Sequence, residues 1–329
     1  HRYIQFQLDF VSGESSGLSL DYLEFDFASP VVSRGILAEI FPDTAAVLGL
    51  PTEFEYVLKP DVATGDVGFN RIDIAVPSPQ ASLDSMLVDD LRWERVMPVP
   101  PVALSQADSA AWITARLSSK TWLDTMSVGS GNRFAAVTWF DTATAVHKLG
   151  IKTRTLTSVD FPRGQDREIG IALTTPIYRL LTGFNSWIWN ETATQELQQP
   201  TQPGNASDRL PSDAVRVTVQ SAGGTISIRQ VSPNPFTPNS DGVNDAAQWT
   251  FDVFLLTAAT DISVTLFNLN GREIRAIGAS ATAGELKISW DGRDESGNLV
   301  PPGIYLYKLF VDSDTDESKE QLGTIAVAY

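Results

Sequence analysis

The sequence predicts an all-β protein made of tandem β-sandwich domains. Apolar and polar residues alternate with a period of two in many short runs, among them "YIQFQLDF", "TEFEYVLK" and "TISIRQV", as expected of strands that bury one face. Val, Ile, Thr and aromatic residues dominate these runs, and Gly, Asn, Asp and Pro separate them. The chain has 329 residues, which exceeds the usual size of one domain, so we expect more than one sandwich.

The leading segment, residues 1–41, contains two alternating strands joined by the turn "VSGESSG". Two strands cannot bury a core alone, so they must pair with something else. The pair "RYIQFQLDF" and "LDYLEFDF" resembles the closing strands of discoidin-like jelly rolls. The resemblance implies that residues 1–41 are the tail of an upstream jelly roll lost by processing or fragmentation. The alternative is that they are assembly strands, which add to a sheet elsewhere.

The middle segment, residues 42–222, is expected to form a large β-sandwich domain. It contains six of the eight Trp residues of the chain. In "SWIWN", Trp187 and Trp189 lie on one face of a strand, where a pair of rings can stack on sugars or pack against a core or a neighbouring strand. Helical patterns are rare: only "SRGILAEIF" at 33–41 and "SQADSAAWITARLSS" at 105–119 suit short helices.

The third segment, residues 223–329, opens with the Pro- and Asn-rich sequence "SPNPFTPNSDGVND" at 232–245. The runs "ISVTLFNLNGREIRAI", "WDGRDESGNLVPPGIYLYKLFVD" and "GTIAVAY" follow. Asn270-Gly271 supplies the positive φ of a tight hairpin turn, and we expect Trp290 to fill a sandwich core. In this order the motifs resemble the Ig-like domain of flagellar hook-capping proteins. They also resemble the C-terminal domains of gliding-motility and type IX secretion cargo.

This resemblance implies an Ig-like C-terminal module and a location outside the cell or on the outer surface of a Gram-negative bacterium. In secretion cargo such a module can be a sorting signal that is recognised at the outer membrane and removed on export. The chain ends in "TIAVAY", without a terminal cluster of Lys or Arg. We therefore expect a retained structural module and not a cleaved signal.

The loop "PNSDGVND" is a candidate metal site. It places Asn239, Asp241 and Asp245 around Gly242, and oxygen-rich loops of this kind suit Ca²⁺. The spacing is not that of an EF-hand, and the alternative is a set of turns capped by Asx side chains. Calcium is the only cofactor that the sequence suggests.

Composition argues against several classes of function. The formal charge of −16 opposes nucleic-acid binding, which needs Lys and Arg, and no apolar run is long enough to span a membrane. Cys is absent and His occurs only as His1 and His147, so we expect neither a zinc site nor a serine triad. We expect no enzymatic activity. The lack of Cys favours an exported protein without disulfides.

Five triplets consist of Asp, then Ser or Thr, then a small or apolar residue. They resemble the O-glycosylation acceptors of Bacteroidota. They predict glycans on Thr44, Ser85, Ser109, Thr125 and Thr142. All five positions precede residue 150, and this clustering favours a glycoprotein.

These features predict a non-catalytic, secreted bacterial surface protein with a structural or adhesive role. The nearest partner for its leading strands is a sheet of the protein's own middle domain. The alternative is a sheet of another subunit or of a neighbouring surface protein, where head-to-tail contacts that do not close would build fibres. The alternative is a carbohydrate-binding accessory region of a secreted hydrolase, with a glycan ligand at Trp187 and Trp189. Exposed planar Trp rings would favour the alternative, and buried rings the first interpretation.

Overall fold

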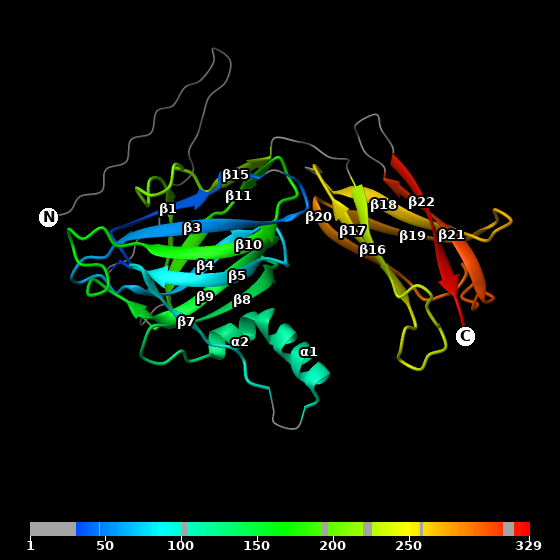
Figure 1. Cartoon of the computed structure of the whole chain (residues 1–329), viewed down its shortest axis with the longest axis horizontal. Coiled ribbons are helices and arrows are strands. Elements are labelled where there is room, and N and C mark those ends of the chain that lie inside the picture. The colour runs from blue at the N-terminus through cyan, green and yellow to red at the C-terminus, as the bar shows by residue number, and fades with distance from the viewer. Residues whose placement is uncertain are drawn as a thin grey trace, which may run out of the picture.

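The structure, a computed structural model, describes residues 31–45, 47–100, 104–192, 197–219, 226–256, 259–311 and 319–329. They form two β-sandwiches that lie end to end (Figure 1), and the predicted all-β class is confirmed. The two leading strands predicted within residues 1–30 lie outside the described residues. No helix in the described ranges is long and apolar enough to cross a membrane.

The first sandwich, residues 31–219, packs two six-stranded sheets around one core. One sheet has the order β14 (Gln202–Pro203), β1 (Gly35–Phe41), β3 (Pro51–Asp61), β10 (Ile169–Pro176), β5 (Ser82–Val88) and β6 (Leu91–Arg92). The other has the order β13 (Leu197–Pro200), β12 (Ser186–Asn190), β4 (Phe69–Val76), β9 (Val146–Leu156), β8 (Arg133–Asp141) and β7 (Glu94–Arg95). A small sheet joins β11 (Leu181–Gly183), β15 (Arg216–Val219) and β2 (Thr44–Ala45).

Residues 35–41 form strand β1, so the helix predicted over 33–41 is wrong. β1 pairs antiparallel with β3 along its whole length, and Ile36, Ala38 and Ile40 alternate into the core. A short apolar run fits both periods, and the neighbouring strand decides between them. β1 therefore belongs to the first sandwich, although the sequence pattern had placed it in the leading segment.

Two helices lie against one face of the first sandwich (Figure 1). The helix predicted within 105–119 is confirmed as α1 (Gln106–Leu117), which is capped by a serine side chain. A second helix, α2 (Lys120–Thr125), was not predicted, and its Leu123 is buried in a cluster with Ala135, Val137 and Trp139 of β8. The helices thereby lie over the β8 side of the second sheet.

The C-terminal module, residues 226–329, is a second sandwich. One sheet has the order β16 (Ile226–Ser232), β17 (Ala247–Val253) and β20 (Gly284–Trp290), and the other β19 (Glu273–Ala281), β18 (Thr260–Phe267), β21 (Gly303–Val311) and β22 (Lys319–Val327). The predicted core residue Trp290 is 0% exposed, and its Nε1 donates to the carbonyl of Arg293 at 2.9 Å. The predicted tight turn is also present, with Gly271 at a φ of 80°.

The Pro-rich sequence that opens the module closes one of its sheet edges. Phe236 is buried in the module core. Its N–H donates to the carbonyl of Ala326 at 3.1 Å, and its carbonyl accepts from the N–H of Ala328 at 2.9 Å. The backbone of Phe236 therefore covers the end of the edge strand β22, as proteins commonly do with exposed strand edges.

Candidate functional site

The outer face of the second sheet carries the two tryptophans singled out from the sequence. Strand β12 alternates, so Ile188 points into the core while Trp187 and Trp189 share the outer face, where both are half-buried. A cation lies over each ring: Lys148 Nζ is 4.8 Å from the centroid of Trp187, and Arg71 Cζ is 5.7 Å from that of Trp189. The rings are therefore neither free platforms nor core residues.

Arg71 is the centre of this face. Its guanidinium is buried and also lies 5.2 Å from the ring centroid of Trp139 on β8, so it is flanked by two indoles. Nε and Nη2 donate to the two carboxylate oxygens of Asp73 at 2.8 and 3.1 Å. Nη1 donates to Asp124 at 2.9 Å and to Glu191 at 2.7 Å. We call this set the aromatic–ionic cluster, and its members are Arg71, Asp73, Asp124, Trp139, Lys148, Lys152, Trp187, Trp189 and Glu191.

Local sequence explains how the cluster forms. On the buried strand β4, Arg71 and Asp73 are two residues apart and so share the outer face. On β9, a Cβ at Gly150 would come within 2.4 Å of the Trp139 ring, so only glycine lets that ring lie over the strand. Helix α2 contributes Asp124 from above. In the sequence, the only signal for this pair is the opposite charge of Arg71 and Asp73, two residues apart in the mostly apolar strand "NRIDIAV".

The charges of the cluster are paired within it or with the adjacent Asp141. Lys152 pairs with Glu191 at 3.0 Å, and Lys148 pairs with Asp141 at 2.6 Å. A hydrogen bond from Lys148 lowers the pKa of Asp141 to about 2. Burial raises the pKa of Asp73, while the Arg71 guanidinium beside it favours the carboxylate. Such a network fixes side chains in place.

A small pocket adjoins the cluster. Its volume is about 230 Å³, and Lys120, Asp141, Thr142 and Trp189 are among its lining residues. Pockets for small molecules are usually larger, about 300–1,000 Å³. Glycan binding at Trp187 and Trp189 stays a prediction, and the cations over both rings reduce the ring surface open to a sugar.

The predicted metal loop is a set of hydrogen-bonded turns. The structure brings Asn239, Asp241 and Asp245 together, but their oxygens accept from backbone amides of the same loop. Asp245 accepts two such bonds, at 2.6 and 2.7 Å, and Asp241 accepts one at 2.8 Å. Asn239 Nδ2 donates to the other oxygen of Asp241 at 3.0 Å. Within the described ranges, no group of three or more His, Cys, Asp or Glu side chains is arranged to hold a metal. Calcium binding here stays a prediction.

The predicted glycosylation sites are scattered over the first sandwich. Thr44 on β2, Thr125 at the end of α2 and Thr142 in the β8–β9 turn are exposed, whereas Ser85 and Ser109 are half-buried. The hydroxyl of Thr125 donates to the carbonyl of Thr121 at 2.9 Å. Exposure is compatible with modification at the three threonines, and all five sites stay predictions.

The two sandwiches are joined by a packed contact that the sequence did not reveal. Phe254, just after β17, belongs to the core of the first sandwich. Its ring stacks on Tyr178, with centroids 5.9 Å apart. On the polar side, Arg229 of β16 donates to the Tyr178 hydroxyl at 3.0 Å and also pairs with Asp252 and Glu285. Burial raises the pKa of Tyr178 to about 12, so this hydroxyl stays protonated at neutral pH.

Among solved structures, the chain is similar to latent PorU from Porphyromonas gingivalis at 11% identity and a TM-score of 0.28, covering 88% of this chain and 20% of that chain. PorZ, a surface component of the type IX secretion system of the same bacterium, is similar at 18% identity and a TM-score of 0.23, covering 44% and 21%. The C-terminal domain of the Streptococcus agalactiae polypeptide BspA is similar at 7% identity and a TM-score of 0.26, covering 89% and 100%.

The chain spans about a fifth of the length of the PorU and PorZ structures. TM-scores of this size carry no argument about fold or activity. No curated protein matches the chain in sequence. Residues 238–315 match the FlgD Ig-like domain, and since they lie within a folded β-sandwich, the C-terminal module is an Ig-like domain similar to that of FlgD.

Proposed function

We propose that the chain is a non-catalytic structural protein of the bacterial cell surface that assembles into fibres by strand addition. The observation that carries this proposal is the free edge of β19 in the C-terminal module. Within the described ranges, β19 pairs only with β18. Beyond the bond from Glu295 N–H to the carbonyl of Ile274 at 3.0 Å, no backbone hydrogen bond to its outer edge is found among the described residues.

Charged residues occur only at the start of β19, at Glu273 and Arg275. Natural sheets usually shield an edge with Lys, Pro, a bulge or a covering loop. From Ala276 to Ala281 the strand reads "AIGASA", without charge or proline. The donor that we propose is the alternating sequence of residues 1–30, which lies outside the described residues. Addition of such a strand from a neighbouring chain is a head-to-tail contact, and it forms a filament when it does not close.

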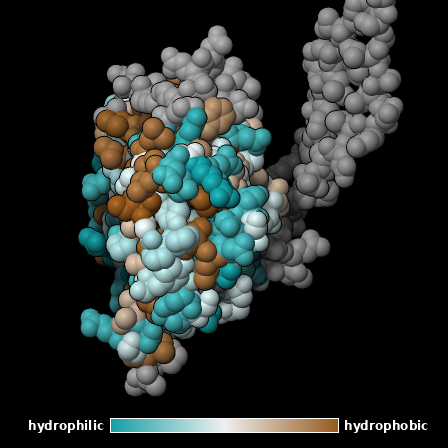
Figure 2. Space-filling view, turned by 90° about the vertical axis from the view of Figure 1, so that its right-hand side faces the viewer, coloured by the Kyte–Doolittle hydropathy of each residue, from teal (hydrophilic) through white to brown (hydrophobic). Residues whose placement is uncertain are grey.

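The contact between the sandwiches supports a retained C-terminal module. Phe254 is 8% exposed and lies in the core of the first sandwich. Removal of the module would leave a gap in that core and expose apolar surface. Two sandwiches joined by a packed contact also suit a structural element of a surface fibre. Figure 2 shows the free end of the module, where apolar side chains lie in patches among polar ones. Exposed Ile304 and Leu322 are available for adhesive contacts.

Location and lack of catalysis belong to the same proposal. A charge of −16 and the absence of Cys suit a protein outside the cell. The similarity of the module to a FlgD Ig-like domain fits a role in an extracellular assembly. We place the protein on the outer surface of a Gram-negative bacterium, as type IX cargo that retains its C-terminal module. The satisfied charges of the aromatic–ionic cluster support a structural role over a catalytic one.

The alternative function, a carbohydrate-binding accessory region, receives less support. Glycan platforms need exposed aromatic faces, and here Lys148 and Arg71 lie over Trp187 and Trp189. Aromatic burial against neighbours is the default for such rings. A glycan array with the full chain and a Trp187→Ala variant would favour the alternative if the full chain binds a sugar and the variant does not.

Fibre assembly is tested by truncation at the correct place. Residues 35–41 are a core strand, so the shortened chain must begin at residue 31 and not at residue 42. We expect the full chain to form large species in light scattering and filaments in electron microscopy, and the shortened chain to stay monomeric.

A charged edge provides the second arm of the test. Gly278→Lys should block assembly, since a Cβ at Gly278 meets no atom within 4 Å and the new charge then lies on the free strand. The matched control is Gln248→Lys, which adds the same charge at an exposed position of the central strand β17. A strictly monomeric full chain, or equal assembly by the Gly278→Lys variant and the control, refutes strand addition at β19.

A further inference from the structure

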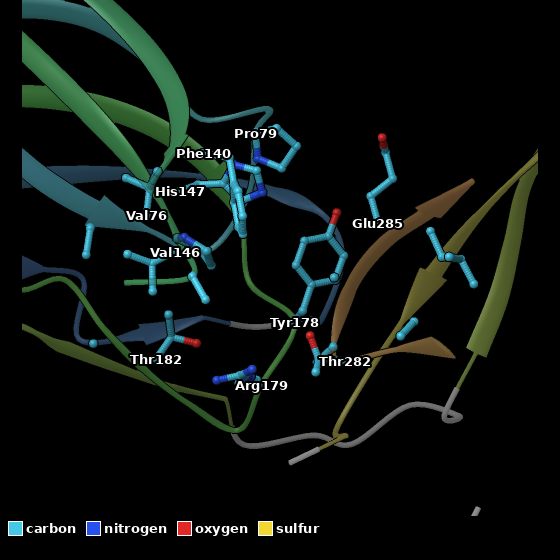
Figure 3. A pocket seen from close by; sticks show the side chains of 18 of the residues that line it. Val76, Pro79, Phe140, Val146, His147, Tyr178, Arg179, Thr182, Thr282 and Glu285 are labelled. Atoms are coloured by element: carbon cyan, nitrogen blue, oxygen red, sulfur yellow. The ribbon is translucent and has the colours of Figure 1, made fainter. Parts of the chain in front are cut away.

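One pocket lies between the two sandwiches. Its volume is about 580 Å³, within the usual range of about 300–1,000 Å³ for small-molecule sites, which occur preferentially at domain interfaces. Three parts of the first sandwich line it: the turn after β4, the β8–β9 hairpin and residues 178–183. The C-terminal module contributes residues 280–286, so both sandwiches are needed to form the pocket (Figure 3).

Two residues of the wall each carry a buried polar atom that has no hydrogen-bond partner among the described residues. The Thr182 side chain is 8% exposed, and its hydroxyl makes no hydrogen bond with any described residue. His147 Nδ1 is likewise buried without a partner. Burial lowers the pKa of His147, so the ring is neutral at pH 7 and its polar atoms are hydrogen-bonding groups. An unpaired buried polar atom costs about 1–3 kcal/mol, which a ligand that supplies the missing partner would recover.

The charge at the pocket is positive. Glu285, the acid on its wall, is paired with Arg229 at 2.6 Å and with Lys287 at 3.0 Å. Arg179 is exposed at the same pocket and makes no ion pair within the described ranges. In Figure 3, Arg179 and Thr182 lie together on one side of the pocket, opposite Phe140 and His147. An unpaired cation beside an unpaired hydroxyl favours a carboxylate, since charge-assisted bonds are the stronger ones.

The rest of the wall is apolar. Val76, Pro79, Phe140 and Leu286 face the same space as Tyr178. The rings of Phe140 and His147 meet edge to face, with centroids 5.0 Å apart, and give this part of the wall aromatic character. A ligand that fits these walls has an apolar or aromatic body, and its carboxylate would point to Arg179 and Thr182.

We propose that this interdomain pocket binds a small organic carboxylate with an aromatic or aliphatic body. Arg179 and Thr182 hold the carboxylate, His147 contributes a hydrogen bond, and Phe140 and Tyr178 contact the body. Because residues 280–286 close the pocket, such a ligand also stabilises the contact between the sandwiches. This inference does not depend on fibre assembly.

The test is an NMR titration of the full chain with two probes of the same shape, phenylacetate and its neutral counterpart phenylacetamide. Ligands of about ten heavy atoms reach millimolar affinity, so we expect saturable shifts with a Kd of about 1–10 mM for phenylacetate. Phenylacetamide should bind at least about 5-fold more weakly, because it lacks the charge. Absence of saturable binding below about 20 mM, or equal binding of both probes, overturns the proposal.

Variants locate the site. Arg179→Gln should weaken phenylacetate binding at least about 5-fold, while Arg272→Gln, an exposed arginine in the β18–β19 turn, should leave it unchanged. Thr182→Val, of nearly the same shape, should weaken binding about 2-fold or more and keep or raise the melting temperature, since it removes an unpaired buried hydroxyl. Binding by Arg179→Gln equal to that of the unmodified chain, or a lower melting temperature for Thr182→Val, refutes the assignment of these residues.

Discussion

The contact between the sandwiches makes a quantitative prediction for Phe254→Ala. Phenylalanine to alanine changes in cores cost about 3–5 kcal/mol. Phe254 is 8% exposed and stacks on Tyr178, an aromatic pair that itself contributes about 0.5–1.5 kcal/mol. We expect a loss of about 3 kcal/mol in the free energy of unfolding of the full chain. Because the lost contacts join two sandwiches, their unfolding transitions should also separate.

A neighbouring glycine allows a stricter test. A Cβ at Gly49 would lie 2.7 Å from the Phe254 ring, and Gly49 has a φ of +78°. Gly49→Ala alone should therefore be destabilising through both the clash and the backbone. In the double variant the clash disappears with the ring and only the backbone cost remains. We expect the two changes to be non-additive, with a coupling of about 1–3 kcal/mol.

The assay is urea unfolding followed by tryptophan fluorescence, with Leu269→Ala as the control. Leu269 is 67% exposed, and such surface changes stay within about 0.5 kcal/mol. If Phe254→Ala matches this control, or if the cycle with Gly49→Ala is additive within about 0.5 kcal/mol, the packed contact does not exist in solution.

Three more predictions concern single sites. Trp290→Ala should cost about 3–5 kcal/mol, and a neutral effect in urea unfolding would remove Trp290 from the core. Glu39 on β1 is fully buried and makes no ion pair with a described residue. Burial raises the pKa of Glu39, and the nearby backbone amides of Ser207 and Ala206 lower it by a smaller amount. Burial therefore favours the protonated carboxyl of Glu39, and its contribution to stability is lost as pH rises from the unfolded pKa through the folded pKa. Glu39→Gln should then raise the melting temperature at pH 7 and change it little at pH about 3; equal effects at both pH values would contradict this. Asp245→Ala should cost about 1–2 kcal/mol by removing the acceptor of two amides, with or without about 1 mM Ca²⁺; a calcium-dependent rise in the melting temperature of the unmodified chain would instead support the metal site.

Several parts of the fold could be read directly from the sequence. Strand alternation predicted the all-β class, because side chains on a strand point to opposite faces and only one face is buried. The Asn270-Gly271 turn and the helix at 105–119 followed from local conformational preference. Trp290 was placed in a core because a large apolar ring has few other locations in a small sandwich. In each case residues near one another in sequence carry the information.

The tertiary structure decided the rest, because its causes are pairings between distant residues. The run at 33–41 fits a helix or a strand by itself, and it is a strand because β3 pairs with it. Trp187 and Trp189 were found from the sequence, but the cations over them come from β4 and β9. Phe254 reads as the end of a strand in its own module, yet its ring lies in the core of the other sandwich. Local patterns determine which residues can form strands, whereas sheet order and domain contacts depend on the free energy of burying surfaces that are far apart along the chain.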